Sequence, residues 1–158
     1  MKRLWAPWRM AYITDKKTKG CLFCRIRRSR QDRKNFVFLR TQHSLAVLNL
    51  YPYNNGHLMV APLRHVRSLS LLPEPELLDL MRCLKKCQVL LTRILKPQGF
   101  NIGVNEGTMA GAGIEDHLHI HLVPRWRGDV NFMPVVASTK IISQSLESLY
   151  GELKKSCR

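Results

Sequence analysis

Residues 117–123 read His-Leu-His-Ile-His-Leu-Val, and this run constrains the fold more than any other segment. Imidazole and apolar side chains alternate with a period of two, which in a β-strand places the imidazoles on one face and Leu118, Ile120 and Leu122 on the other. We therefore predict a strand over 117–124 whose apolar face packs on a core. A single histidine is usually structural, but three aligned on one strand indicate a function.

The segments around this strand predict a sheet and a long helix. Apolar side chains recur at helical spacing over 73–96, where Cys83 and Cys87 are expected to be small core residues, and Pro97 ends the pattern. A glycine-bearing loop is expected over 106–113 and a terminal helix over 141–155. The further predicted strands are 36–40, 44–50, 57–62 and 100–105. We therefore expect an α+β fold, with an antiparallel five-stranded sheet, one long helix and a C-terminal helix.

Composition limits the class of protein. A length of 158 residues fits one domain, and we divide it into an N-terminal arm (1–20), a main domain (21–136) and a C-terminal helix packed on that domain (137–158). No uncharged apolar run approaches the roughly 18 residues of a membrane span. The N-terminus lacks the pattern of a signal peptide, and five cysteines form an odd set, so we expect a reducing, cytoplasmic location without a membrane partner.

The net charge and the cysteine spacing indicate which ligands the protein could bind. The 26 Lys and Arg exceed the 11 Asp and Glu, and the net charge of +15 favours polyanions, although a solvated basic surface without a partner explains it equally well. Cys21 and Cys24 have the C-x₂-C spacing with which two thiolates grip zinc, a site that needs two further ligands. The aligned histidines themselves suit either metal coordination or nucleophilic attack by a neutral imidazole.

The histidine run resembles the signature of the histidine triad (HIT) superfamily. The resemblance extends from about Cys21 to Pro134 and includes Gly56-His57 before a predicted strand and 105–107, Asn-Glu-Gly, ahead of the triad. Segments 110–114, 123–126 and 128–132, together with 4–10, resemble a bacterial branch that contains diadenosine tetraphosphate phosphorylases. We therefore expect a HIT-like fold, and the resemblance implies a homodimer or higher homo-oligomer that joins two sheets.

The resemblance also implies roles for individual residues. His119 would attack the α-phosphate of a nucleotide to give a nucleotidyl-histidine, His121 would contact the phosphate or assist the leaving group, and His57 would support the triad. Asn49 would contact the ribose and Asn105 the phosphate side, although both are also ordinary strand-end and turn residues. Gly111 and Gly113 offer backbone N–H groups to phosphate oxygens, and a plain turn is the equal alternative.

One departure concerns the loop that precedes the triad. Many family members carry Gly-Gln-Ser or Gly-Gln-Thr there, whereas residues 111–114 of this chain read Gly-Ala-Gly-Ile. The contacts that those polar side chains make to a leaving group therefore do not carry over.

Zinc-containing relatives suggest the rest of the metal site. In them a cysteine pair, a histidine after the strand that begins at Gly56-His57, and the first triad histidine bind the metal. The corresponding residues here are Cys21, Cys24, His65 and His117. A zinc bound to His117 would be structural and would leave His119 free to react.

Three functions follow from these observations. The first is cleavage of dinucleoside polyphosphates such as diadenosine tetraphosphate, by phosphorolysis with inorganic phosphate as co-substrate or by hydrolysis. The second is hydrolysis of a nucleoside phosphoramidate or adenylyl conjugate. The third, from a different class, is a zinc-stabilised nucleic-acid-binding module with Trp5, Trp8 and Trp126 as stacking residues. We rank the third lowest, because nucleic-acid binding does not require three aligned histidines.

Overall fold

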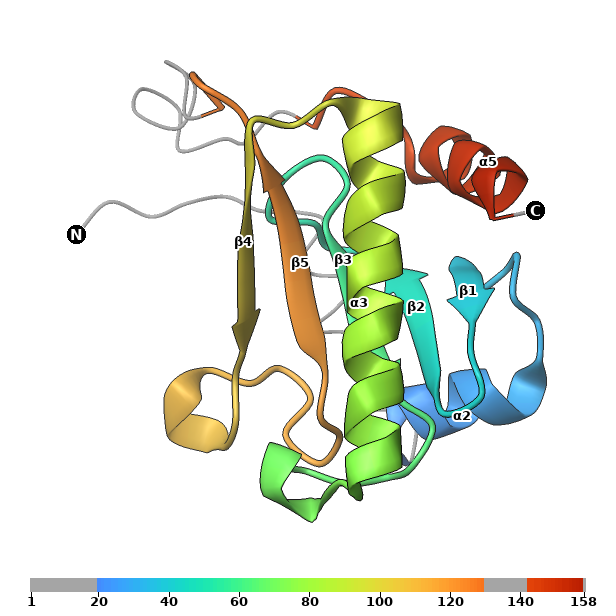
Figure 1. Cartoon of the computed structure of the whole chain (residues 1–158), viewed down its shortest axis with the longest axis vertical. Helices are drawn as coiled ribbons and strands as arrows, with labels where there is room; N and C mark the ends of the chain where they lie inside the picture. The colour runs from blue at the N-terminus through green and yellow to red at the C-terminus, as the bar shows by residue number, and fades with distance from the viewer. Residues whose placement is uncertain (1–19, 130–141, 158) are drawn as a thin grey trace.

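The computed structural model describes residues 20–129 and 142–157, so most of the expected N-terminal arm, with Trp5 and Trp8, lies outside the described residues. The described part is an α+β domain built on one antiparallel five-stranded sheet (Figure 1), as the sequence predicts. Its strands are β1 (Val37–Arg40), β2 (Ser44–Leu48), β3 (Leu58–Pro62), β4 (Gly99–Val104) and β5 (Ile120–Arg125). Its helices are α2 (Leu22–Ser29), α3 (Glu74–Leu95) and α5 (Leu146–Ser156), with single 3₁₀ turns at Leu69–Leu71 and Thr108–Ala110.

The order of the strands, β1-β2-β3-β5-β4, places the histidine strand inside the sheet. β3 leads into α3, which runs the length of the sheet before the chain returns as β4. β5 then fills the place between β3 and β4, where His121 is paired with Met59 on one side and with Gly103 on the other. Strand β4 forms one edge of the sheet, and β1 forms the other.

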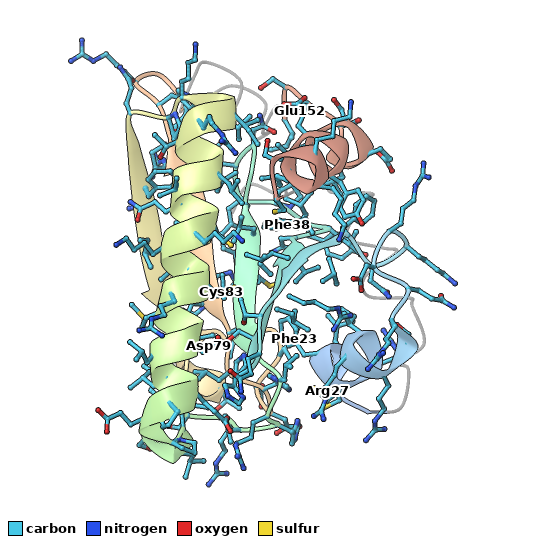
Figure 2. The ribbon with its side chains drawn as sticks, turned by 45° about the vertical axis from the view of Figure 1, so that its right-hand side comes forward. Phe23, Arg27, Phe38, Asp79, Cys83 and Glu152 are labelled. Atoms are coloured by element: carbon cyan, nitrogen blue, oxygen red, sulfur yellow. The ribbon has the colours of Figure 1, made fainter. Side chains whose placement is uncertain are left out.

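The two faces of the sheet carry separate apolar clusters. Phe38, Leu58 and Leu122 belong to a large cluster that α3 and α5 cover, together with Leu118 and Ile120. The opposite face, which α2 covers, holds a smaller cluster that includes Phe23 and Ile26 of that helix. Figure 2 shows Phe23 and Arg27 on α2 and Cys83 on α3, with the sheet between the two helices. The apolar side of the histidine strand is therefore buried beneath α3, as predicted.

Helix α3 agrees closely with its sequence pattern. It starts after Pro73, with Pro75 in the first turn, and stops at Lys96, whose backbone is left-handed (φ 47°), just before Pro97. Cys83 and Cys87 are buried in the core, which confirms their expected packing role. None of the helices in the described ranges is long and apolar enough to cross a membrane.

Asp79 anchors α3 to the β1–β2 turn. Its Oδ2 accepts hydrogen bonds from Thr41 Oγ1 (2.6 Å), Ser44 Oγ (2.8 Å) and the backbone N–H of His43 (3.2 Å). Burial raises the pKa of this carboxyl, but the three donated bonds outweigh burial and hold the pKa below its ordinary value. This charge-assisted network fixes the axial position of the helix on the sheet.

Three elements differ from the sequence prediction. Helix α5 begins at Leu146 instead of residue 141, because the side chain of Ser145 accepts from the backbone N–H of Ser148 and caps the helix there. Strand β5 begins at Ile120 instead of residue 117, because the preceding segment pairs with the loop after β3, where Leu118 N–H donates to the carbonyl of Val66 (2.7 Å). Helix α2 is absent from the prediction. It has only eight residues, too few for a helical period to stand out, and its stability comes from packing Phe23 and Ile26 on the sheet.

Candidate active site and metal centre

His119 lies on the α2 face of the sheet with a defined tautomer. It is 3% exposed, and its ring centroid is 5.3 Å from that of Phe23. Its Nδ1 lies 2.8 Å from the carbonyl oxygen of His117, which can only accept, so Nδ1 carries the proton and Nε2 a lone pair. Burial lowers the pKa of His119 and outweighs the opposing effect of this hydrogen bond. A neutral imidazole with a lone pair on Nε2 can act as a nucleophile.

His121 has the opposite tautomer because of a chain of hydrogen bonds. The backbone N–H of Tyr53 donates to His57 Nδ1 (3.0 Å), so a neutral His57 carries its proton on Nε2. That Nε2–H donates to His121 Nδ1 (2.9 Å), which leaves His121 with its own proton on Nε2. Burial, and then the neighbouring His119, lower the pKa of His121 to about 4, so it remains a neutral donor near pH 7.

The nucleophile and the donor are neighbours. The His119 and His121 rings meet edge to face with their centroids 4.8 Å apart. One imidazole therefore offers a lone pair, and the adjacent imidazole offers an N–H bond. This pair of complementary nitrogens is suited to attack on phosphorus combined with hydrogen bonding to a phosphoryl or leaving oxygen.

The predicted substrate-binding residues are distributed unevenly around this pair. Asn49 is close to the site: its Oδ1 accepts from the backbone N–H of Tyr51 (2.9 Å), and its Nδ2 lies 3.4 Å from His57 Nδ1. Asn105 is half-buried just after β4, and Gly111 and Gly113 are exposed in the loop that leads to β5. Within the described residues, no hydrogen bond links the Asn105 side chain to the triad. Gly111 ends the 3₁₀ turn with a φ of 78°, which favours glycine.

A second cluster joins the two cysteines of α2 to two histidines. The ligand atoms of Cys21, Cys24, His65 and His117 all lie within 4.8 Å of one another. His117 Nδ1 is 3.1 Å from Cys21 Sγ, 3.8 Å from Cys24 Sγ and 3.3 Å from His65 Nδ1, while Cys24 Sγ is 3.4 Å from His65 Nδ1. Bond lengths of about 2.0–2.1 Å to nitrogen and 2.3 Å to sulfur around tetrahedral zinc require edges of roughly 3.4 Å (N to N) and 3.6 Å (S to N). These four N-to-N and S-to-N separations thus lie close to the edges of a tetrahedral zinc site.

Sequence position and hydrogen bonding orient these four ligands. Cys21 is the N-cap residue of α2 and Cys24 lies in its first turn, so the helix presents both thiols together. His117 Nε2–H donates to the carbonyl of Pro62 (2.9 Å), which turns the lone pair of Nδ1 toward the thiols. Burial and the adjacent Cys21 raise the pKa of Cys24. A divalent cation would offset the repulsion between two neighbouring thiolates and favour the deprotonated form of both cysteines.

The structure adds contacts that pattern reading did not find. The Tyr53 ring lies against both His57 and His121, with centroids 4.4 Å and 5.7 Å apart. The ring of Phe23, a core residue, contacts His117 as well as His119. Residues 52–56 read Pro-Tyr-Asn-Asn-Gly, which is typical of a turn, and no local signal assigns Tyr53 a place beside the triad.

The fold and the site together define a class of protein. A five-stranded antiparallel sheet holds the last histidine of a His-x-His-x-His segment on its interior strand β5, and a fourth histidine is hydrogen-bonded to that residue. The HIT domain family model matches residues 30–128. This chain belongs to the histidine triad family.

Several members of this family are similar to the chain in sequence or in structure. A Mycobacterium tuberculosis protein named AP-4-A phosphorylase is 40% identical over 155 residues, which covers 92% of this chain and 79% of the relative. A Schizosaccharomyces pombe protein named bis(5'-nucleosyl)-tetraphosphatase (asymmetrical) is 36% identical over 115 residues, covering 72% of this chain and 63% of the relative. The crystal structure of a Zn-bound histidine triad family protein from Mycobacterium smegmatis superposes with a TM-score of 0.70 at 24% identity, covering 87% of this chain and 92% of that one, and supports the fold alone.

Proposed function

We propose that the chain is an enzyme that cleaves dinucleoside polyphosphates, such as diadenosine tetraphosphate, through a nucleotidyl-histidine on His119. The observation that carries this proposal is the pair of opposite tautomers, a lone pair on His119 Nε2 beside an N–H on His121 Nε2. The relatives named AP-4-A phosphorylase and bis(5'-nucleosyl)-tetraphosphatase support the substrate class.

The proposed reaction has two displacements. His119 Nε2 attacks the α-phosphorus, an N–P bond forms, and the P–O bond to the leaving nucleotide breaks with its electron pair on that oxygen. The Nδ1–H stays bound to the His117 carbonyl, which stabilises the charged imidazole. His121 Nε2–H donates to the developing charge on oxygen. In the second step an acceptor oxygen attacks phosphorus, and the N–P bond breaks to restore the lone pair.

The acceptor of the second step is proposed to be inorganic phosphate. Diadenosine tetraphosphate and phosphate would then give ATP and ADP, whereas water as acceptor would give ATP and AMP. The M. tuberculosis relative, named a phosphorylase, supports phosphate as acceptor.

Product analysis separates these possibilities. Incubation with diadenosine tetraphosphate is expected to yield ADP only when phosphate is present. AMP formation at the same rate without phosphate would instead make the enzyme a hydrolase. If adenylyl conjugates are cleaved and dinucleoside polyphosphates are not, the substrate class is wrong. Salt-sensitive oligonucleotide binding without any turnover would indicate the nucleic-acid-binding module.

We further propose that Cys21, Cys24, His65 and His117 bind a structural zinc. Support comes from the tetrahedral dimensions of the cluster, from its mixed thiolate and imidazole donors, and from the hydrogen bond that orients His117. The solved relative from M. smegmatis is described as Zn-bound. Such a zinc would tie α2 to the segment that precedes β5, and the reacting nitrogen would belong to His119 instead.

A homodimer is the proposed assembly. Strand β4 is an edge strand with an exposed centre, and Ile102 on it is 48% exposed. Leu78 and Met81 on α3 are similarly exposed. Within the described residues β4 pairs only with β5. An open strand edge and exposed apolar side chains both favour association with a second copy, which would extend the sheet.

Domain division and compartment also remain proposals. The side chains of Leu149, Tyr150 and Leu153 on α5 lie in the same cluster as those of α3, which supports a C-terminal segment, 137–158, that packs on the main domain 21–136. The five cysteines are all free thiols, which supports a reducing compartment such as the cytoplasm.

A further inference from the structure

The turn that precedes β3 determines the tautomers of the proposed active site. The backbone N–H of Tyr53 donates to His57 Nδ1 (3.0 Å), and the backbone N–H of His57 donates to the carbonyl of Asn54 (3.1 Å). A neutral imidazole that accepts at Nδ1 must carry its proton at Nε2. The position of one backbone amide therefore decides which nitrogen of His57 carries the proton, and so whether His57 donates to His121.

A buried clamp holds this turn in place. Asn54 is 5% exposed, and its Nδ2 donates to the carbonyl of Pro124 (3.0 Å) and to Asp129 Oδ2 (2.8 Å). Both partners only accept, so the orientation of the amide is fixed by chemistry. The two contacts join the turn to the end of β5 and to the loop beyond it, more than 60 residues away in the sequence.

Further contacts hold Asp129 and the turn in place. Asp129 also accepts two hydrogen bonds from the Arg125 guanidinium and one from the backbone N–H of Trp126 (3.3 Å). Gly56 has a φ of 76°, and a Cβ there would lie 3.0 Å from Pro124 Cγ, so the turn packs tightly on β5. An aspartate held from several sides is a rigid acceptor for Asn54.

We propose that Asn54, clamped by Asp129 and Pro124, is a positioning residue that fixes the tautomers of His57 and His121. It holds the Tyr53 amide against His57 Nδ1, and His57 then donates to His121 Nδ1, which leaves the proton of His121 on Nε2. Asn54 acts through two other residues and does not touch substrate. The catalytic part of this inference rests on the proposed function, since it assumes that His121 donates to a phosphate or leaving oxygen.

Nitrogen NMR of the full-length, zinc-loaded protein tests the clamp without any substrate. In the wild type, His57 and His121 are expected to show the N–H on Nε2 and an unprotonated Nδ1. In Asn54→Ala, the Tyr53 amide is released and His57 should populate both tautomers. Asn101→Ala is the matched control, because Asn101 accepts from Arg125 (2.6 Å) on the far side of Asp129 and leaves both Asn54 contacts intact.

Kinetics add a second readout. Asn54→Ala is expected to lower kcat about tenfold or more, since small misplacement of reacting groups is costly, with KM changed much less. The exchange Asn54→Asp with Asp129→Asn restores a donor and an acceptor across the contact between residues 54 and 129 but not the contact with the Pro124 carbonyl, so it should recover part of the kcat that Asn54→Asp alone loses. If Asn54→Ala does not fold, Asn54→Ser replaces it in the NMR and kinetic experiments. The serine side chain is too short to reach both the Pro124 carbonyl and Asp129.

Unchanged tautomers in Asn54→Ala, or a fall in kcat no larger than that in Asn101→Ala, would overturn the proposal. Mixed tautomers with a loss confined to KM would overturn its catalytic part. If the wild type cleaves no dinucleoside polyphosphate, the proposed function fails, yet the NMR comparison still decides whether Asn54 sets the tautomers.

Discussion

His117, His119 and His121 alternate along one segment, yet their ring nitrogens meet different partners. His117 offers Nδ1 to the thiols, His119 leaves Nε2 unprotonated, and His121 receives a hydrogen bond from His57. In each ring one nitrogen is engaged by a neighbour, and the tautomer follows from that contact. The division of labour that we propose thus depends on hydrogen bonds and not on the identity of the side chains.

Acid stability reports on the burial of His121. Its pKa in the folded protein, about 4, lies below the ordinary value of 6.5, so between these values the unfolded chain binds more protons than the folded one. The free energy of unfolding should therefore decrease as pH falls from 6.5 toward 4. Urea unfolding at several pH values measures this change.

The matched variant for this measurement is His121→Gln, which cannot titrate. It is expected to lose less stability over the same pH range than the wild type does. Parallel curves for the two proteins would show that His121 is not buried as a neutral group.

Residue-level prediction from sequence was accurate where the pattern was local. The alternation at 117–123 was sufficient to place Leu118, Ile120 and Leu122 in the core. The tautomers were not predictable, because they depend on Tyr53 and Asn54, whose contacts with the triad and with Asp129 arise only in the folded chain. A turn motif specifies a backbone shape but not the group that its amide meets.

Among the helices, α2 was not predicted from the sequence. Its eight residues are marginal as a helix, and what holds them is the burial of Phe23 and Ile26 together with the proposed metal at its N-terminus. The long helix α3 was predictable because its period repeats over several turns. The start of β5 was misplaced because pairing to Val66, which lies outside any strand, ends the regular ladder.

Removal of the proposed zinc should loosen α2. We expect about one zinc per chain in the wild type and none in Cys21→Ser, together with a lower Tm, since a structural zinc contributes directly to folding. Metal analysis and thermal unfolding measure the two effects. Cys157→Ser is the control, because that half-buried thiol lies at the far end of the chain. Equal zinc content in wild type and Cys21→Ser would contradict the assignment.

At the scale of the whole molecule, one strongly basic segment begins on the face of the sheet that carries His119. Residues 25–34 include six Arg and Lys and a single acidic residue, Asp32, which is paired with Arg40 at 2.7 Å. This segment begins on α2, on the same face of the sheet as His119, whereas α3 covers the other face. A polyanionic substrate should therefore be attracted toward the correct face.

Salt and charge variants test this steering. Replacing Arg25, Arg28 and Arg30, which lie on α2 and at its C-cap, with Gln should raise KM for diadenosine tetraphosphate severalfold at low ionic strength and leave kcat nearly unchanged, and the difference should vanish at high salt. The matched control replaces Arg82, Lys85 and Lys86 on the exposed side of α3, which removes the same charge from the opposite face. Equal effects of the two triple variants would show that only net charge matters.

The central claim is that His119 carries the nucleotidyl group. Rapid quenching of the wild type with diadenosine tetraphosphate in the absence of phosphate, followed by peptide mapping by mass spectrometry, measures it directly. We predict an AMP adduct on His119, no adduct in His119→Ala, and a loss of turnover in that variant of about 10³-fold or more. An adduct on another residue, or turnover in His119→Ala equal to that of the wild type, would contradict the account.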